Sequence, residues 1–437
     1  MKKKLIMNTS TINSQEVNIK LFEGEIVDFD HKKDSKNQES QDLTDDEINQ
    51  KYIEGDIRIV TEQARYPLSS VVSMINTNKY QLNPDFQRRR RWNNVRKSRL
   101  IESFIMNVPI PPIFLYEISF AEFEVMDGQQ RMSTIYDFYE NKFALEGLQE
   151  WKELNGKTYD SLPDQVRAGI DRRYISSIIL LKETGKTEEQ AKKLKKLVFE
   201  RLNSGGIKLE AQETRNALYD GPFNQLCIEL SGNETFRKLW NITIKDDDVL
   251  SSLENGNLLQ YEECQEDEYE EKETSEIYKK MDDVEFVLRF FAYRHINKIE
   301  SRPLNNILDD FLIQGNEFQE LVLDQYKNLF EETIYLISEI LEEKAFWLWR
   351  KGRKGSRRQN DWVWSNKPMK FVYDPIMQAF SQYTDQSEKL ISKKQDIQKE
   401  IKQFYEKNSD LFEGRKTTIN HVAERIKLTI EFLEQFS

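Results

Sequence analysis

The chain has 437 residues, of which 32% are charged and 38% hydrophobic, and its formal net charge at pH 7 is -12. No apolar run approaches the roughly 20 residues of a membrane-spanning helix, and the two cysteines, Cys227 and Cys264, form no Cys-x-x-Cys pair, which indicates a reducing compartment. Because an acidic chain repels nucleic acid, any contact with DNA or RNA must come from local basic patches.

The N-terminal part is polar. Residues 1–55 are rich in Lys, Asp, Gln, Ser and Asn and poor in aromatic side chains. This composition predicts a largely disordered polar tail. The apolar residues near Met1 are too few for a signal peptide. We therefore expect a cytoplasmic protein whose first folded domain begins near residue 56.

Residues 56–225 alternate between two kinds of pattern. Short β-rich runs lie at 57–60, 114–118, 123–126 and 175–181. Helical patterns lie at 68–76, 96–106, 133–139, 162–171 and 188–202. This alternation predicts a compact α/β domain.

Within this domain, Asp127-Gly128-Gln129-Gln130-Arg131 lies where an apolar run gives way to a helical pattern. A glycine at a strand-to-helix junction lets the backbone approach a ligand, and the first turn of the helix favours an anion, usually phosphate. Arg131 offers a planar fork for phosphate oxygens, and Asp127 is a candidate metal ligand or water-polarising group. Taken alone, the five residues are also explained by a tight turn capped by polar groups. The neighbouring motifs favour a binding site instead.

Motifs on both sides accompany this turn. Upstream lie Leu82-Asn83-Pro84-Asp85-Phe86-Gln87-Arg88, Trp92, Leu100-Ile101-Glu102-Ser103 and the run at 109–115. Downstream lie the run at 199–206, then Leu209, Gln212, Glu213, Arg215 and Ala217. In this order and spacing, residues 57–223 resemble the N-terminal domain of GmrSD-type modification-dependent restriction proteins, long catalogued as domain of unknown function 262. The resemblance implies a fold similar to the ParB/sulfiredoxin fold and, as in several members, binding and hydrolysis of a nucleoside triphosphate at the Asp-Gly-Gln-Gln-Arg turn.

The resemblance also implies roles for individual residues. Arg131 and Arg88 hold phosphates, beside Gln87 and the backbone of Gly128. Asp127 binds Mg²⁺ or polarises water, and Gln129 or Gln130 orients the nucleophile. The run Met132-Ser133-Thr134 departs from the usual continuation of the family, but the pocket residues are intact. The sequence has no Walker A motif, so a P-loop enzyme is not expected.

A second glycine turn follows the helical pattern at 188–202 and adds Arg201, Asn203, Gly205 and Gly206 to the predicted nucleotide pocket. Asn203 can orient water or a ribose hydroxyl, and the glycines permit left-handed turns or a close backbone approach. The two glycines also suit an ordinary helix C-cap, which does not exclude a binding role.

Helical patterns dominate residues 226–437, where we expect an α-helical domain. They lie at 281–297, 304–312, 318–342, 376–382, 387–407 and 421–436. The acidic segment 262–276 lacks the spacing of an EF-hand loop and favours a solvated segment. The narrow apolar stripe at 387–407 fits either a surface helix or an oligomerisation seam. The chain as a whole is therefore predicted to be α+β, with a small ParB/sulfiredoxin-like α/β domain followed by a mostly α-helical domain.

Two basic patches are candidates for nucleic-acid contact. The first is Arg88–Arg91, continued by Arg96, Lys97 and Arg99, with Trp92 inside it. The second is the basic loop at 350–358, framed by four tryptophans, whose candidate residues are Arg350, Arg353, Lys354, Arg357 and Arg358. Basic side chains interleaved with aromatic ones suit phosphate contact plus base stacking, whereas the alternative for any charge run is a solvated face.

The three histidines, His31, His295 and His421, are scattered and form no pair of the kind that a His-Asn-His nuclease needs. The sequence therefore predicts a cytoplasmic prokaryotic defence protein, of anti-phage or restriction type, that binds and hydrolyses a nucleoside triphosphate with Mg²⁺. Its helical half would contact a partner: DNA, a separate effector subunit or a second copy of the chain. The alternatives are a non-enzymatic nucleotide- or DNA-binding regulatory switch and a nuclease with an unrecognised site.

Overall fold

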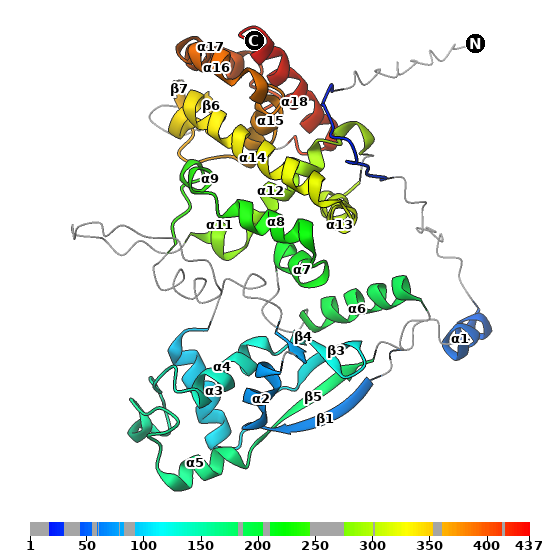
Figure 1. The fold of residues 1–437 in the computed structure, drawn as a ribbon, viewed down its shortest axis with the longest axis vertical. Helices are drawn as coiled ribbons and strands as arrows, with labels where there is room; N and C mark the ends of the chain where they lie inside the picture. Colours follow the sequence, from blue (N-terminus) through cyan, green and yellow to red (C-terminus); the bar gives the residue numbers. More distant parts are fainter. Residues whose placement is uncertain are drawn as a thin grey trace, which may run out of the picture. The chain divides into compact units, whose positions relative to one another are not determined.

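The computed structural model describes residues 17–29, 44–54, 59, 61–77, 79–82, 92–181, 187–203, 210–244, 275–299, 302–352, 361–412 and 416–437. The chain divides into two compact units (Figure 1). The helical unit comprises residues 1–31, 221–243 and 282–437, and the sheet unit comprises residues 32–220 and 244–281. Segments of the two units therefore alternate along the sequence, and residues 221–243 of the helical unit lie between the two segments of the sheet unit. In the described part, no helix is long and apolar enough to cross a membrane.

The sheet unit contains one mixed five-stranded sheet. Its strands are β1 (Thr61–Pro67), β2 (Tyr80–Gln81), β3 (Ile113–Ser119), β4 (Glu122–Asp127) and β5 (Tyr174–Leu180), in the order β1-β5-β3-β4-β2. β1 is antiparallel to β5 and β3 to β4, whereas β3 is parallel to β5 and β2 to β4. The first described strand begins at Thr61, after the β-rich run predicted at 57–60, most of which lies outside the described residues.

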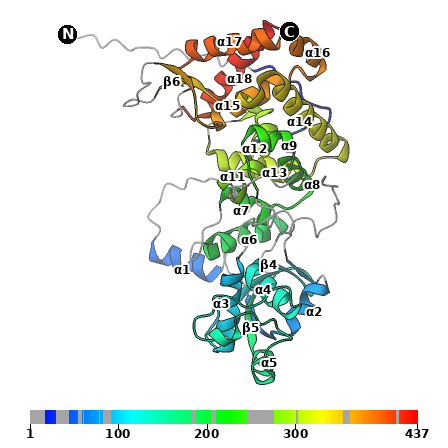
Figure 2. The same cartoon turned by 90° about the vertical axis from the view of Figure 1, so that its left-hand side faces the viewer.

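Helices cover both faces of this sheet (Figure 2). One face packs on α2 (Ser70–Asn76), α3 (Asn94–Ile105) and α4 (Gln129–Tyr139), and the other on α6 (Glu188–Asn203) and α7 (Ala211–Leu218). Because side chains alternate along a strand, Ile113 and Leu115 join the first core while Phe114 and Tyr116 join the second. The unit also contains α1 (Asp45–Glu54), η2 (Lys152–Leu154), α5 (Asp164–Asp171) and α11 (Glu276–Lys279).

The helical unit is built around an aromatic core. Its helices are α8 (Pro222–Ser231), α9 (Glu234–Leu239), α12 (Asp282–Tyr293), α13 (Leu304–Gly315), α14 (Glu320–Leu341), α15 (Lys370–Phe380), α16 (Ser387–Ser392), α17 (Lys394–Lys407) and α18 (Ile419–Glu434). Short 3-10 turns lie at η4 (Ile296–Lys298), η5 (Glu342–Lys344) and η6 (Thr384–Gln386), and a hairpin joins β6 (Trp349–Lys351) to β7 (Trp362–Trp364). Phe291 stacks on Tyr326 and Trp240 on Phe286, with ring centroids 4.3 and 4.1 Å apart. Together with the mixed sheet, this confirms the predicted α+β class.

Two helices of this unit differ most from their predicted extents. The helix expected at 376–382 begins at Lys370 and contains Pro375 in its middle. A proline inside a helix removes one backbone bond, and burial of Val372, Tyr373 and Ile376 in the core offsets that loss. The helix expected at 387–407 is split into α16 and α17 at Lys393, and its apolar residues Leu390, Ile397 and Ile401 are buried. This apolar stripe therefore packs inside the unit.

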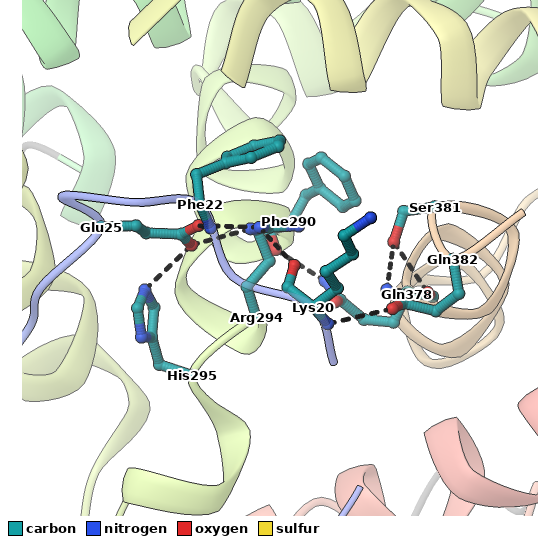
Figure 3. A network of polar contacts seen from close by, with 9 residues as sticks. All are labelled: Lys20, Phe22, Glu25, Phe290, Arg294, His295, Gln378, Ser381 and Gln382. Carbon is teal, nitrogen blue, oxygen red and sulfur yellow. Dashed lines mark hydrogen bonds and ion pairs between the residues drawn. The ribbon is translucent and has the colours of Figure 1, made fainter. Parts of the chain in front are cut away.

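The prediction that residues 1–55 are largely disordered is wrong for residues 17–29, which we call the N-terminal strap. The strap runs along the helical unit and is held through both its backbone and its side chains; Figure 3 shows the contacts around Lys20 and Glu25. Asn297 bonds both the N–H and the carbonyl of Val17, at 2.9 and 2.6 Å, and Gln314 bonds those of Asp28, at 2.9 and 2.8 Å. The side chains of Val17, Val27 and Phe29 are buried. Residues 45–54 also form a helix, α1.

Glu25 anchors the strap through buried charges. Arg294 donates from Nε to Glu25 Oε1 at 2.8 Å and from Nη2 to Oε2 at 2.7 Å, while His295 Nε2 lies 3.1 Å from Oε1. Burial by itself raises the pKa of a carboxyl group, but the bonds from Arg294 and His295 overcome it and lower the pKa of Glu25 to about 2. Arg294 also donates to the Lys20 carbonyl at 2.9 Å. His295 therefore has a structural role.

Candidate functional site

The candidate site is the turn between β4 and α4. Asp127 ends the strand, and Gly128 precedes the helix with φ 101° and ψ 7°, the left-handed region that favours glycine. A Cβ atom on Gly128 would lie 2.4 Å from Cγ2 of Ile113, the first residue of β3. Any other residue would collide with the neighbouring strand, so both the backbone angle and the close approach require glycine here.

The Arg131 side chain turns back over this glycine. Its Nη2 donates to Asp127 Oδ2 at 2.9 Å and to the Pro112 carbonyl at 3.3 Å, and its Nη1 donates to the Pro111 carbonyl at 3.1 Å. The Arg131 side chain is 11% exposed and that of Asp127 is 38% exposed. The fork thus joins the turn to the proline run before β3, and the carboxylate that it holds is open to solvent.

The N-cap residue of α4 is Gly128, which has no side chain to cap the helix, and the first backbone bond of the helix runs from Met132 N–H to the Gly128 carbonyl at 2.9 Å. The partial positive charge of the helix N-terminus therefore lies beside the Asp127–Arg131 pair. Such a combination of a glycine turn, a helix N-terminus and a guanidinium group suits an anion.

Gln130 connects this turn to α3. Its side-chain Oε1 accepts the main-chain N–H of Trp92 at 3.2 Å, and Asn93 caps α3 by accepting the Arg96 N–H at 3.0 Å. The Arg96 guanidinium lies over the Trp92 ring, with Cζ 4.7 Å from the centroid. An ion pair of Lys97 with Asp137, at 2.9 Å, further joins α3 to α4.

A buried carboxylate fixes the far side of α3. Glu102 is 4% exposed, and its Oε1 accepts three main-chain N–H groups, from Gln149, Glu150 and Trp151, at 3.0, 2.8 and 3.0 Å. These bonds hold the segment before η2 against α3. Glu102 belongs to one of the motifs upstream of the turn, and its role in the structure is to order the scaffold around the candidate site.

The structure places only part of the predicted pocket. Asp127, Gly128, Gln129, Gln130 and Arg131 lie together in the turn. Arg201 is exposed in the last turn of α6 and Asn203 ends that helix, which packs on the other face of the sheet through an ion pair of Lys195 with Glu124 at 2.6 Å. Four predicted residues lie outside the described residues: Gln87, Arg88, Gly205 and Gly206.

Sequence reasoning missed the acceptors of the Arg131 fork. They are the carbonyls of Pro111 and Pro112, in the proline run before β3, to which the motifs gave no role. The direction in which these carbonyl groups point depends on the path of the chain in the folded protein. The only hint in the sequence was the pair of prolines, which fixes an extended backbone.

The predicted Mg²⁺ would be held through Asp127. Among the residues that the structure describes, no three His, Cys, Asp or Glu side chains gather as a metal site. Mg²⁺ bound with a nucleotide needs only one or two protein carboxylates besides phosphates and water. The half-exposed Asp127 carboxylate fits that requirement.

The second candidate site is the β6–β7 hairpin of the helical unit. Trp349 and Trp364 meet edge to face at 5.4 Å, and Lys402 and Lys351 lie over the rings of Trp349 and Trp362 at 5.1 and 5.9 Å. The Trp349 Nε1–H donates to Glu406 at 2.8 Å. Arg350 lies in β6; the predicted residues Arg353, Lys354, Arg357 and Arg358 lie outside the described residues.

Comparison with known families agrees with the resemblance that the motifs indicate. Residues 68–219 match the family model described as GmrSD restriction endonuclease, N-terminal domain. This match confirms the resemblance and covers β2 to β5, α2 to α7 and the candidate turn. Residues 68–219 are therefore similar to the N-terminal domain of a restriction endonuclease. We found no match to the chain among curated proteins or among solved structures.

Proposed function

We propose that this protein acts in the prokaryotic cytoplasm as an anti-phage, restriction-type defence protein that binds and hydrolyses a nucleoside triphosphate at the turn of residues 127–131. The observation that carries the proposal is the packing of Gly128 against β3, which places the N-terminus of α4 beside the Asp127–Arg131 pair. The N-terminus of α4 offers a partial positive charge to phosphates, and Arg131 adds a full charge when it turns from Asp127 to the ligand. The family match of residues 68–219 supports the defence context.

In this proposal the residues of the turn share the chemistry of phosphoryl transfer, which needs positioning and charge neutralisation above all. Arg131 turns from Asp127 to phosphate oxygens, and Asp127 holds Mg²⁺ or polarises water. Gln129 or Gln130 orients the attacking water. Bound Mg²⁺ would supply charge neutralisation on the phosphates. Gln87, Arg88, Arg201, Asn203, Gly205 and Gly206 remain predicted members of the pocket.

Calorimetric titration with nucleoside triphosphates and Mg²⁺, together with steady-state phosphate release, tests this function. Saturable binding with turnover supports the hydrolase. Binding without turnover favours the alternative of a regulatory switch. A plasmid-nicking assay with Mg²⁺ or Mn²⁺ tests the remaining alternative, a nuclease with an unrecognised site; we expect no cutting of unmodified plasmid, and cutting that disappears in Asp127→Ala would change the substrate to a phosphodiester.

A second candidate function is contact with nucleic acid at the β6–β7 hairpin. Its support is the position of Lys351 and Lys402 over tryptophan rings, with Arg350 in the same hairpin, since such surfaces combine phosphate contact with base stacking. The partner would be DNA; a separate effector subunit or a second copy of the chain are the other partners that we propose. Binding of that partner to the helical unit would then be coupled to binding or hydrolysis of the nucleotide at the turn.

A further inference from the structure

Trp92 and Arg96 lie beside the candidate triphosphate turn and have no role in the proposed chemistry. Trp92 is fixed there because its main-chain N–H donates to Gln130 Oε1 at 3.2 Å. Its half-buried indole packs against the core on the α3–α4 face of the sheet. The Arg96 guanidinium covers the ring, with Cζ 4.7 Å from the centroid. A flat aromatic surface and an exposed cation thus adjoin the turn.

The polar atoms around this surface are donors. Arg96 is exposed, and among the described residues its guanidinium meets no carboxylate, so its N–H groups are available. Gln130 uses its side-chain oxygen for the Trp92 N–H, which leaves its amide NH₂ with two donors and no acceptor in the part of the chain that the structure describes. A ligand that satisfies these groups must present an aromatic face and acceptor atoms along one edge.

We propose that Trp92 and Arg96 form the base-binding part of the nucleotide site and favour guanine over adenine; this inference rests on the proposed function. The base takes the place of the guanidinium on the indole, and Arg96 turns to the edge of the base. Guanine presents two acceptors there, O6 and N7, whereas adenine pairs one acceptor with a donor amine. Arginine binds the guanine edge through two parallel bonds, and base stacking on an aromatic ring is strong for either base.

Titration of the full chain with GTP, ATP and inorganic tripolyphosphate, each with Mg²⁺, tests this assignment. Wild type should bind GTP roughly tenfold more tightly than ATP. Trp92→Leu should weaken GTP binding at least about tenfold and change tripolyphosphate binding by less than about twofold, because only the nucleotide has a base to stack. Trp92→Phe keeps an aromatic face and should retain most of the GTP affinity.

Arg96→Gln has a matched control in Arg99→Gln, since both residues are exposed on α3 and lose the same charge. Arg96→Gln should remove the preference for GTP over ATP, and Arg99→Gln should keep it. Because Arg96 is on the surface, its replacement leaves the fold intact even if Trp92→Leu does not.

Three results would overturn the inference. In the first, wild type binds neither tripolyphosphate nor nucleotide, and the proposed function falls as well. In the second, Arg96→Gln weakens the binding of tripolyphosphate as much as the binding of GTP, which would make Arg96 a phosphate ligand. In the third, wild type binds triphosphates but Arg96→Gln matches Arg99→Gln in every titration; the base-binding role then falls while the proposed function stands.

Discussion

Each unit contains an arginine–carboxylate pair, and the two pairs differ in what surrounds them. In the helical unit, Arg294 and Glu25 are 1% and 0% exposed, and both oxygens of Glu25 accept bonds from Arg294. In the sheet unit, Arg131 and Asp127 are 11% and 38% exposed. One carboxylate is enclosed and saturated, and the other has a side open to solvent.

The difference separates a structural pair from a candidate functional one. A buried pair that satisfies all of its partners fixes one arrangement, and removing either member leaves a buried charge. A half-exposed pair beside a helix N-terminus can exchange its partner for a ligand at a smaller desolvation cost. We therefore expect changes at Glu25 to act on stability and changes at the turn to act on binding and turnover.

The largest expected effect is that of Glu25→Ala, which leaves Arg294 buried without its carboxylate. Loss of one partner from a buried pair costs about 3–5 kcal/mol. The unfolding free energy of the helical unit should fall by that amount in denaturant titrations. Ile26→Ala, at a neighbouring side chain that is 78% exposed, is the control and should change the unfolding free energy by less than about 0.5 kcal/mol. Equal effects of the two variants would mean that the strap is held by its backbone alone.

The same pair predicts an acid-sensitive strap. The folded-state pKa of Glu25, about 2, lies below the ordinary value of 4.5, so its stabilisation is present above pH 4.5 and is lost as the pH falls towards 2. The difference corresponds to roughly 3 kcal/mol. Between pH 5 and 3, wild type should lose more unfolding free energy than Glu25→Gln does, with a slope that approaches about one proton per molecule. Parallel profiles for the two proteins would contradict the assignment.

At the turn, Asp127→Ala should lower phosphate release more than it lowers triphosphate affinity, because the carboxylate acts on metal or water while Arg131 acts on phosphate. A loss of about 100-fold in turnover would be typical of a removed catalytic group. Asp137→Ala, which breaks the Lys97 ion pair on the same helix, is the control for an effect on α4 alone. Equal losses of binding and turnover in Asp127→Ala would indicate that the residue only holds the turn together.

The smallest effect on triphosphate turnover is expected from the basic loop. Replacing Arg353, Lys354, Arg357 and Arg358 with Gln should flatten the dependence of duplex-DNA affinity on salt, by about 0.9 in the log–log slope for each phosphate that the loop no longer neutralises. Turnover should stay near the wild-type rate. Gel shifts across a salt series measure the slope. A mutant that binds DNA like wild type would identify the loop as a solvated surface and leave Arg88–Arg91 as the remaining basic patch.

Periodicity predicted most of the elements, because the buried faces of β3, β4 and β5 and of α12 to α14 repeat with the spacing of strands and helices. The strap could not be predicted for a physical reason. Residues 1–55 are polar on average, and the partners that hold the strap are far away in sequence: Arg294 bonds Glu25, and the Phe29 ring meets those of His295 and Phe311. The composition of a segment carries no information about contacts with residues so far away in the sequence.

The candidate site, like the fold, was predictable only in its local features. The glycine turn, its helix and the identity of Arg131 follow from local sequence, and the left-handed angle of Gly128 agrees with the use of glycine there. That Arg131 is already bonded to Asp127, Pro111 and Pro112 depends on how β3 and β4 pair, which the local pattern does not specify.

The most direct test of the contrast between the two pairs is a calorimetric titration of wild type, Arg131→Ala and Arg131→Lys with a nucleoside triphosphate and Mg²⁺. We predict that wild type binds the triphosphate saturably. Arg131→Ala should lose about 1.5–3 kcal/mol or more of binding free energy, since a charge-assisted fork is removed. Arg131→Lys, which keeps the charge without the fork, should lie between them. Folded Arg131→Ala protein that binds the triphosphate with wild-type affinity would contradict the account.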